Sequence, residues 1–557
     1  MGFGACLAKQ GHGATEASGC AIARRTGRRE DWQALIVCAL AVLLYASLHA
    51  ELPIDDTDRF SPSIAAGVFE WDASHLLMQP AVVLWHRFLS FGDPARSSQE
   101  RFNAFCAALS LGIFYLLLFR LGVGVARRVL LTALAALSYN LLNLATSGHI
   151  KLAVLPFLAV SLYHATLWEG DERGAGTGGT IRLTAAAVGL GIAAAFLINS
   201  ILVMPFLALA IVAVSLRAGH GMRRVLGRAL GFAGLCGATA LTLLGAAYLL
   251  VGGGPATPGG FLGFVFAKSA QRPPFAGVES LARGVFGVVQ NFVYAGDFGA
   301  MLRTWMSGDA FSPGSHLRSL LTEGAIFLVA AVLLAWIYGE GLARLARGRG
   351  VAAVPWAFVL GALAFAIPWN LNESDFYFQI TFPTVALMAS APPAARWRTL
   401  YALLLALVAG TVLLGWALPK RRYPLSRYNA ELQARLTPQN LAVHWYNYTG
   451  GPSLIFMRLP GVPRLHPDRI YELDPDPGRF FPRLARALDR QLVAGGRVYL
   501  FGILDDRSWN APWPTLRRKG LTPARLEAFF RDRYTVVDRG EMAEIPCWEL
   551  LPKPHGP

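Results

Sequence analysis

A series of apolar segments, each long enough to cross a lipid bilayer, constrains the fold of this chain more than any other feature. A membrane-spanning helix needs roughly 17 to 25 predominantly apolar residues. Segments of this length lie at residues 32–50, 102–119, 129–147, 152–168, 229–251, 319–338, 351–369 and 399–418, and shorter ones lie at 183–198, 201–216 and 376–391. The sequence therefore predicts a polytopic α-helical membrane protein with about eleven transmembrane helices.

Two of the shorter segments leave an alternative open. Only Asn199 and Ser200 separate 183–198 from 201–216, so the two form either a tight helical hairpin or a re-entrant pair. Removing both from the count leaves the topology of all other segments unchanged, because two spans together return the chain to the same side.

The composition excludes a soluble globular enzyme. Of the 557 residues, 54% are hydrophobic and only 15% are charged, which is too apolar for a soluble chain. The net charge of +16 does not indicate nucleic-acid binding, because Lys and Arg fall in short clusters between the apolar segments. Six Cys residues show no CxxC pair, so the sequence predicts neither a disulfide framework nor a zinc site.

The basic clusters fall on alternate loops and therefore predict the topology. They are Arg24–Arg29, Arg120 with Arg127 and Arg128, Arg173 with Arg182, Arg217 with Arg223, Arg224 and Arg228, Arg344 with Arg347 and Arg349, and Arg396 with Arg398. Such clusters mark loops that face the cytoplasm. We therefore expect a multi-pass protein of the bacterial inner membrane, with its N-terminus in the cytoplasm and outer loops at 51–100 and 252–318.

Three regions follow from this topology. Residues 1–31 are Gly-rich and polar and are expected to form a disordered cytoplasmic tail. Residues 32–418 are expected to form the transmembrane domain. Residues 419–557 are charged, alternate between helix-like and strand-like stretches and carry an N-cap signal at Thr522–Pro523, so they predict a small periplasmic α/β domain.

The first outer loop is the most informative segment for function. It concentrates acidic side chains at Asp55, Asp56 and Asp58, directly after the first apolar segment. The text ELPIDDTDRFSPS is followed by FEWDASHLLMQPAVVLWHRFLSF, an amphipathic, aromatic-rich stretch of the kind that lies along a membrane surface.

In this loop the chain resembles the GT-C family of integral membrane glycosyltransferases, which use polyprenyl-phosphate-linked sugars. The resemblance covers the paired Asp55 and Asp56, the WDASHLLMQP stretch, about eleven spans, an outer C-terminal domain, and the polar-aromatic entry NESDFYFQITFPTVALMAS into a Pro-containing helix. It implies that a sugar is transferred from a polyprenyl-phosphate donor to a glycan, lipid or protein acceptor of the cell envelope. It matches no single subfamily.

The resemblance also implies roles for particular residues. Attack by an acceptor hydroxyl or amine needs a general base, which Asp55 or Asp56 would supply. The phosphate leaving group needs cations, which Lys268, Arg272 and Arg303 would supply. Alternatively, Asp55, Asp56 and Asp58 hold a divalent cation, Mg²⁺ or Mn²⁺, that neutralises the phosphate. His75, Glu373 and Asp375 complete the expected substrate-binding set.

Each of these residues has a simpler interpretation. The three Asp residues would then be a solvated acidic loop, and His75 an interfacial histidine. Lys268 and Arg272 would bind lipid head groups. The long Arg303 side chain would extend so that its guanidinium reaches the membrane–water interface. Glu373 and Asp375 would cap a helix at the membrane boundary.

Two other function classes remain open from the sequence. A transporter or flippase would place ionisable groups near the bilayer midplane, often in two repeated halves, whereas the acids here cluster in an outer loop and no repeat is evident. A non-catalytic GT-C-like scaffold would use its C-terminal domain to bind a partner. Membrane lipids are expected partners in every case, and nucleic acid is not.

Overall fold

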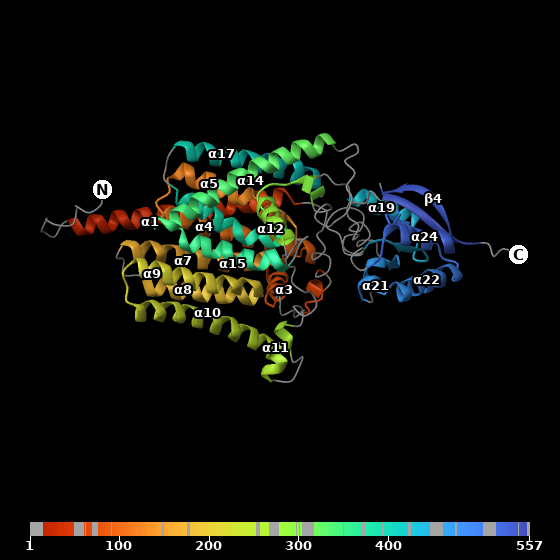
Figure 1. Cartoon of the computed structure of the whole chain (residues 1–557), viewed down its shortest axis with the longest axis horizontal. Helices are drawn as coiled ribbons and strands as arrows, with labels where there is room; N and C mark the ends of the chain where they lie inside the picture. The colour runs from red at the N-terminus through yellow and green to blue at the C-terminus, as the bar shows by residue number, and fades with distance from the viewer. Residues whose placement is uncertain are drawn as a thin grey trace.

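The computed structural model consists of a helical body and a smaller unit built on a β-sheet (Figure 1). It describes residues 15–49, 61, 63–69, 76–90, 92–147, 150–174, 179–251, 257–266, 278–296, 298–299, 301–302, 317–348, 350–369, 374–391, 395–421, 425–445, 461–473, 476–504, 520–543 and 545–553. The sheet unit lies at the end of the body where α3, α11 and α12 are found, and the start of α1 lies at the other end.

The helical body contains long antiparallel helices and shorter pieces at their ends. Its elements are α1 (Thr15–Ser47), α3 (Met78–Leu89), α4 (Ala95–Arg120), α5 (Val125–Leu137), α6 (Tyr139–Thr146), η2 (Ile150–Val154), α7 (Leu155–Gly174), α8 (Gly179–Phe196), η3 (Ile198–Leu202), α9 (Val203–Arg217), α10 (Met222–Val251), α11 (Pro258–Phe266), α12 (Val278–Gln290), α14 (Leu317–Ala346), α15 (Ala353–Trp369), η6 (Ser374–Ile380), α16 (Thr381–Ala389), α17 (Ala395–Ala409), the π-helix η7 (Gly410–Ala417) and α18 (Leu418–Arg421).

Seven helices among the described residues are long and apolar enough to cross a membrane, or eight if the bent pair α5 and α6 is one span. Both segments around Asn199 belong to these seven, as Gly179–Phe196 and Ile198–Arg217. Asp31–Ser47, Ala353–Pro368 and Phe376–Ala389 are apolar but shorter. The chain is thus a multi-helix membrane protein, and the count of about eleven spans stays a prediction.

Helix α1 begins at Thr15, so a helix extends into the segment 1–31 for which the sequence predicts disorder. Its apolar part begins only at Asp31. The Ala and Arg residues between these points favour helix, and the absence of apolar periodicity does not exclude a helix that continues from an apolar one.

The basic clusters of five different loops lie together at one end of the helical body. Two of these loops meet at Glu172, which is next to Arg173 in the chain. Glu172 accepts from Arg228 Nη1 at 2.8 Å and lies 2.6 Å from His220 Nε2, both within residues 217–228. The other links are Arg182 with Asp171, Arg217 with the Leu345 carbonyl, Arg127 with the Met388 and Ala391 carbonyls, and Arg344 with the Leu387 carbonyl. We call this end the basic end, and the opposite end the sheet end.

The sheet unit is built from β1 (Leu441–Val443), β2 (Arg464–Leu465), β3 (Val498–Phe501), β4 (Tyr534–Met542) and β5 (Ile545–Pro552), with helices α19 (Leu425–Arg435), α21 (Pro467–Leu473), α22 (Pro477–Val493) and α24 (Pro523–Arg533). Its strand order is β2-β1-β3-β5-β4, with β1 parallel to β2 and β3, and with β5 antiparallel to β3 and β4. Helix α24 begins after Thr522, whose hydroxyl accepts from the Arg525 N–H, as the sequence predicts.

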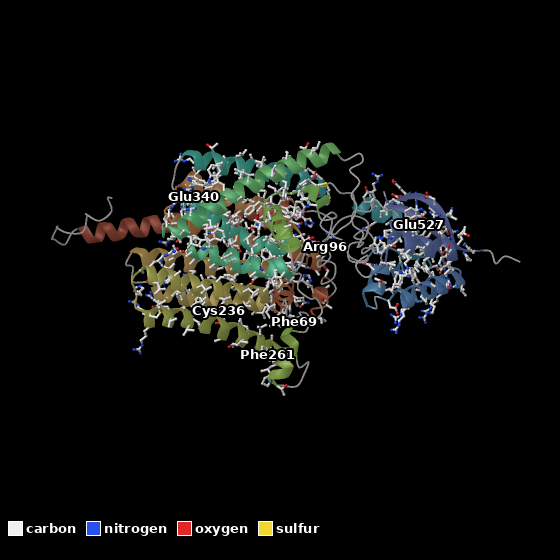
Figure 2. All side chains as sticks on the ribbon, in the orientation of Figure 1. Phe69, Arg96, Cys236, Phe261, Glu340 and Glu527 are labelled. Carbon is white, nitrogen blue, oxygen red and sulfur yellow. The ribbon has the colours of Figure 1, made fainter. Side chains whose placement is uncertain are left out.

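Small residues set the closest helix contacts. At Gly361 of α15, an added Cβ would lie 2.5 Å from the Cα of Val203 in α9. Membrane helices without a strong hydrophobic drive for association rely on such close backbone approach. Side chains fill the rest of the body, with Phe69, Arg96 and Phe261 at the sheet end and Glu340 toward the basic end (Figure 2).

We predict that Gly361→Ala lowers the apparent melting temperature of the purified protein, because the methyl group forces α15 away from α9 at a cost of about 1 to 3 kcal/mol. Gly339→Ala in α14 is the matched control, since nothing lies within 4 Å of its Cβ position and Ala is the better helix former. Equal melting temperatures for the two variants would contradict the contact.

Candidate polar site at the sheet end

Helix α12 exposes apolar side chains and buries several polar ones. Its exposed face carries Leu281 (63% exposed) and Val285 (58% exposed). Its buried face carries Ser280, Arg283 and Gln290, each 5 to 6% exposed. Spacings of three and seven residues place these polar side chains on one side of the helix. Phe286 and Val289 are buried on the same helix, at 7% and 2% exposed, so α12 exposes apolar side chains, as contact with lipid requires, and buries polar and apolar side chains together.

Two glycines allow this polar face to pack closely. An added Cβ would lie 2.7 Å from the Ile367 side chain at Gly284, and 2.4 Å from the Tyr377 ring at Gly287. Tyr377 belongs to η6, so α12 and η6 lie against each other. One turn beyond Gly287, Asn291 donates through Nδ2 to the Thr381 hydroxyl at 3.0 Å. Because both residues are buried (0% and 1% exposed), this bond fixes the end of α12 to the start of α16.

The break between α5 and α6 meets the same segment. These two helices differ in direction by 61°, so the first N–H groups of α6 lack carbonyl partners within the helix. The N–H of Tyr139 donates to the Phe292 carbonyl, and that of Asn140 donates to the Asn291 carbonyl, each at 3.2 Å. The chain after α12 therefore satisfies a helix terminus that would otherwise be unpaired.

A buried lysine lies beside η6. Lys151 of η2 is 4% exposed, and its Nζ lies 3.8 Å from the centre of the Phe376 ring. Helix η2 also contacts α3 and α6. A cation over an aromatic face is stabilised electrostatically, and an ionisable group buried among membrane helices marks a functional site more often than a structural one. Lys151 and Arg283 thus bring positive charge to the sheet end.

Carboxamide oxygens add hydrogen-bond acceptors at the same end of the body. Gln290 Oε1 and Asn291 Oδ1 are buried, and neither has a hydrogen-bond partner among the described residues. A buried acceptor without a partner costs about 1 to 3 kcal/mol, which a hydroxyl-bearing ligand or a water molecule would remove. The α12 polar site, defined as Lys151, Arg283, Gln290, Asn291 and Thr381, therefore suits a ligand with both an anionic group and hydroxyl groups.

Aromatic rings border this site. Tyr139 lies 5.3 Å from Tyr294 and 5.4 Å from Trp416, measured between ring centres. Trp416 belongs to η7, and π-helical segments inside membrane helices often occur at functional positions. The last apolar helix thus contacts the segment that follows α12.

A second polar group lies close to the start of α4. Glu100, whose side chain is 7% exposed, lies 3.0 Å from His49 Nδ1 and 3.0 Å from Arg96 Nε. His49 follows α1 directly and precedes the acidic loop in the chain. These contacts hold the two ends of the first predicted outer loop together at the sheet end.

The sheet unit has a polar cluster of its own. His444 and His466 follow the parallel strands β1 and β2, with ring centres 4.5 Å apart. Burial, reinforced by His466, holds the pKa of His444 well below its ordinary value, so this imidazole is neutral. Its Nδ1 donates to the Trp445 carbonyl at 2.9 Å. Among the described residues, no group of three His, Cys, Asp or Glu side chains is placed to hold a metal ion.

Most residues selected from the sequence lie outside the described residues: Asp55, Asp56, Asp58, His75, Lys268, Arg272, Arg303 and Glu373. Asp375 lies in η6, one residue before Phe376. Lys151, Arg283, Gln290, Asn291 and Thr381 were not predicted from the sequence. The available signal was the pattern of 278–290, where polar residues recur at helical spacing between apolar ones, and the single lysine at the edge of the 152–168 segment.

Comparison with known proteins gives structural matches only. No family model and no curated protein matches this sequence. ArnT from Cupriavidus metallidurans bound to undecaprenyl phosphate is 10% identical, covers 94% of this chain and 98% of its own, and has a TM-score of 0.48. The oligosaccharyltransferase AglB from Archaeoglobus fulgidus, with an inhibitory peptide and a dolichol-phosphate, is 13% identical over 94% of this chain and 75% of its own, with a TM-score of 0.44.

A protein O-mannosyltransferase complex of S. cerevisiae, bound to its sugar donor, is 13% identical with a TM-score of 0.30. That match covers 38% of this chain and 33% of the yeast chain, so this chain spans about a third of it. All three structures are members of the GT-C family that the sequence resembles. Because their TM-scores are below 0.5, they assign neither activity nor substrate to this chain.

We predict that Thr381→Val destabilises the protein by about 1 to 3 kcal/mol, because the buried Nδ2 of Asn291 loses its acceptor. Thr381→Ser keeps the hydroxyl and is expected to stay within about 1 kcal/mol of the wild type. Thermal unfolding in detergent measures both. A Val variant as stable as the Ser variant would show that the bond contributes nothing.

Proposed function

We propose that this protein is a glycosyltransferase that moves a sugar from a polyprenyl-phosphate donor to a cell-envelope acceptor at the outer face of the bacterial inner membrane. The observation that carries the proposal is the burial of Arg283 on α12, at the same end of the helical body as the buried Lys151. The donor class is the one that the family resemblance of the sequence implies.

The orientation follows from the two ends of the body. The basic end would face the cytoplasm, since Lys and Arg are retained on that side of short loops. The sheet end, the α12 polar site and residues 419–557 would then face the periplasm. The three shorter apolar helices would complete about eleven spans.

The donor would bind with its phosphate at the α12 polar site. A phosphodiester linking sugar and prenyl chain carries one negative charge, which Arg283 and Lys151 would neutralise, together with Lys268, Arg272 and Arg303. Leu281 and Val285 on the opposite face of α12 would contact lipid and the prenyl chain. Gln290 and Asn291 would accept hydrogen bonds from sugar hydroxyls.

The reaction would need one base and one stabilised leaving group. Asp55 or Asp56 would take the proton from the acceptor hydroxyl or amine as its oxygen or nitrogen attacks the anomeric carbon. The bond from that carbon to the phosphate oxygen breaks, and the polyprenyl phosphate leaves with the electron pair, so the anomeric configuration inverts. Asp55, Asp56 and Asp58 offer the oxygen ligands that Mg²⁺ or Mn²⁺ prefers, and such an ion would add positive charge at the phosphate.

We predict that Asp55→Asn or Asp56→Asn lowers transfer of labelled sugar from a panel of polyprenyl-phosphate donors by about 10²- to 10⁴-fold, the usual contribution of a general base. When one Asp is the base, the substitution of the other Asp is the control for effects on the folding of the loop. Membranes with wild-type and variant proteins at equal abundance provide the measurement. Wild-type membranes that transfer no sugar from any donor would favour the transporter or the non-catalytic scaffold.

We predict that Lys151→Met and Arg283→Met each lower kcat/KM for the donor by about 10²-fold or more, as for the loss of one donor to a developing oxyanion. Arg223→Met removes an exposed cation at the basic end and is expected to leave transfer unchanged. Loss of transfer in all three variants would point to a general electrostatic effect and contradict a phosphate site at α12.

A further inference from the structure

Positive charge in this protein is not confined to the loops between the helices. Residues 419–557 contain 22 Lys and Arg against 14 Asp and Glu, a net charge of +8 and half of the +16 of the whole chain. The rule that retains positive residues in the cytoplasm concerns short loops and residues near the ends of spans, whereas long domains cross regardless of charge. Topology therefore does not explain the charge of this region, contrary to the interpretation of the net charge from the sequence.

Helix α22 carries the most regular part of this charge. Arg479, Arg483, Arg486 and Arg490 follow one another at spacings of four, three and four residues, and all four are exposed. These spacings align them in a single row of about 16 Å along the helix. The opposite face buries Phe480, Leu484 and Leu488 in the core of the sheet unit, so the row cannot turn inward. In Figure 2, nitrogen-tipped side chains project from this edge of the unit.

The acidic residues of α22 do not pair with the second half of the row, Arg486 and Arg490. Asp489 faces α24 and β4, where it pairs with Arg533 and accepts from the Tyr534 hydroxyl at 2.8 Å. Asp476 lies before the first turn, at 3.5 Å from Arg479 Nε, the first arginine of the row. Among the described residues, no carboxylate pairs with Arg486 or Arg490. Such a row raises the local potential and the self-repulsion of the folded state.

We propose that the exposed face of α22 binds a linear polyanionic glycan of the cell envelope, one that carries carboxylate or phosphate groups along its length. Arginine forks match both groups, and a row of charges along a helix matches a chain with repeated charges better than a single ion. The sheet unit extends beyond the ends of the helices (Figure 1), where a glycan can reach it. The choice of a glycan over a nucleic acid rests on the proposed outer location of residues 419–557.

Binding of fluorescent polygalacturonate to the full-length protein in nanodiscs of zwitterionic lipid tests this proposal, because binding needs no sugar transfer. We expect salt-sensitive binding that weakens about tenfold or more in Arg486→Ala/Arg490→Ala. Arg525→Ala/Arg531→Ala on α24 removes the same charge from another helix of the unit and is expected to bind like the wild type. Neutral dextran is expected not to bind.

Three outcomes would overturn the proposal. They are absence of polygalacturonate binding, equal weakening in the two double variants, and binding of phosphatidylglycerol vesicles but not of polygalacturonate, which would assign α22 to a lipid surface. Since each readout is a binding constant, these outcomes are independent of the proposed transferase activity. Loss of transfer with intact polygalacturonate binding would instead contradict the transferase and leave the α22 surface in place.

Discussion

Burying a charged or hydrogen-bonding group among apolar helices costs free energy unless a partner pairs with it. The arrangement of this protein depends on the partners that such groups find at its two ends. An Asp, Lys or Arg side chain in the middle of a membrane helix costs about 2.5 to 3.5 kcal/mol on insertion scales. At the basic end, Glu169 accepts from the N–H groups of Ala352, Ala353 and Val354 and so caps α15. Arg128, 3% exposed, lies over the Tyr115 and Phe119 rings, although its Nε and Nη1 atoms have no hydrogen-bond partner among the described residues.

The sheet end distributes its polar groups differently. There the carbonyls after α12 satisfy the broken start of α6, and one Asn–Thr bond joins α12 to α16. Gln290 and Asn291 nevertheless keep acceptor atoms directed to the interior without a partner among the described residues. Buried polar atoms without a partner among the described residues thus occur at both ends, since Arg128 also keeps such atoms at the basic end. The choice of the sheet end for the chemistry rests instead on the proposed orientation, in which that end faces the periplasm.

Apolar length and basic clusters were sufficient to predict a multi-helix membrane protein, because both depend on composition within a short window. The helix after Thr522 was predictable for the same reason, since a cap and a proline act locally. The break at Ser138 was not predictable from the sequence, because 129–147 is one continuous apolar segment. The carbonyls of Asn291 and Phe292, which accept from the first N–H groups after the 61° bend, are distant in the chain. The α12 polar site also depends on tertiary contacts: Gly287 has a role only because Tyr377 lies against it. The acidic loop is evident in the sequence. The cation–π contact that marks Lys151 was not predictable, because its partner Phe376 lies 225 residues later in the chain.

We propose that a lipid-linked phosphate binds at the α12 polar site, and photo-crosslinking tests this binding most directly. A polyprenyl phosphate with a diazirine beside its phosphate would be irradiated with the full-length protein in nanodiscs, and the labelled peptides sequenced. We predict labels within residues 278–294 and 150–154, and we expect excess unlabelled polyprenyl phosphate to prevent this labelling. Competable labels confined to the basic end, at residues 217–228 or 344–347, would contradict it.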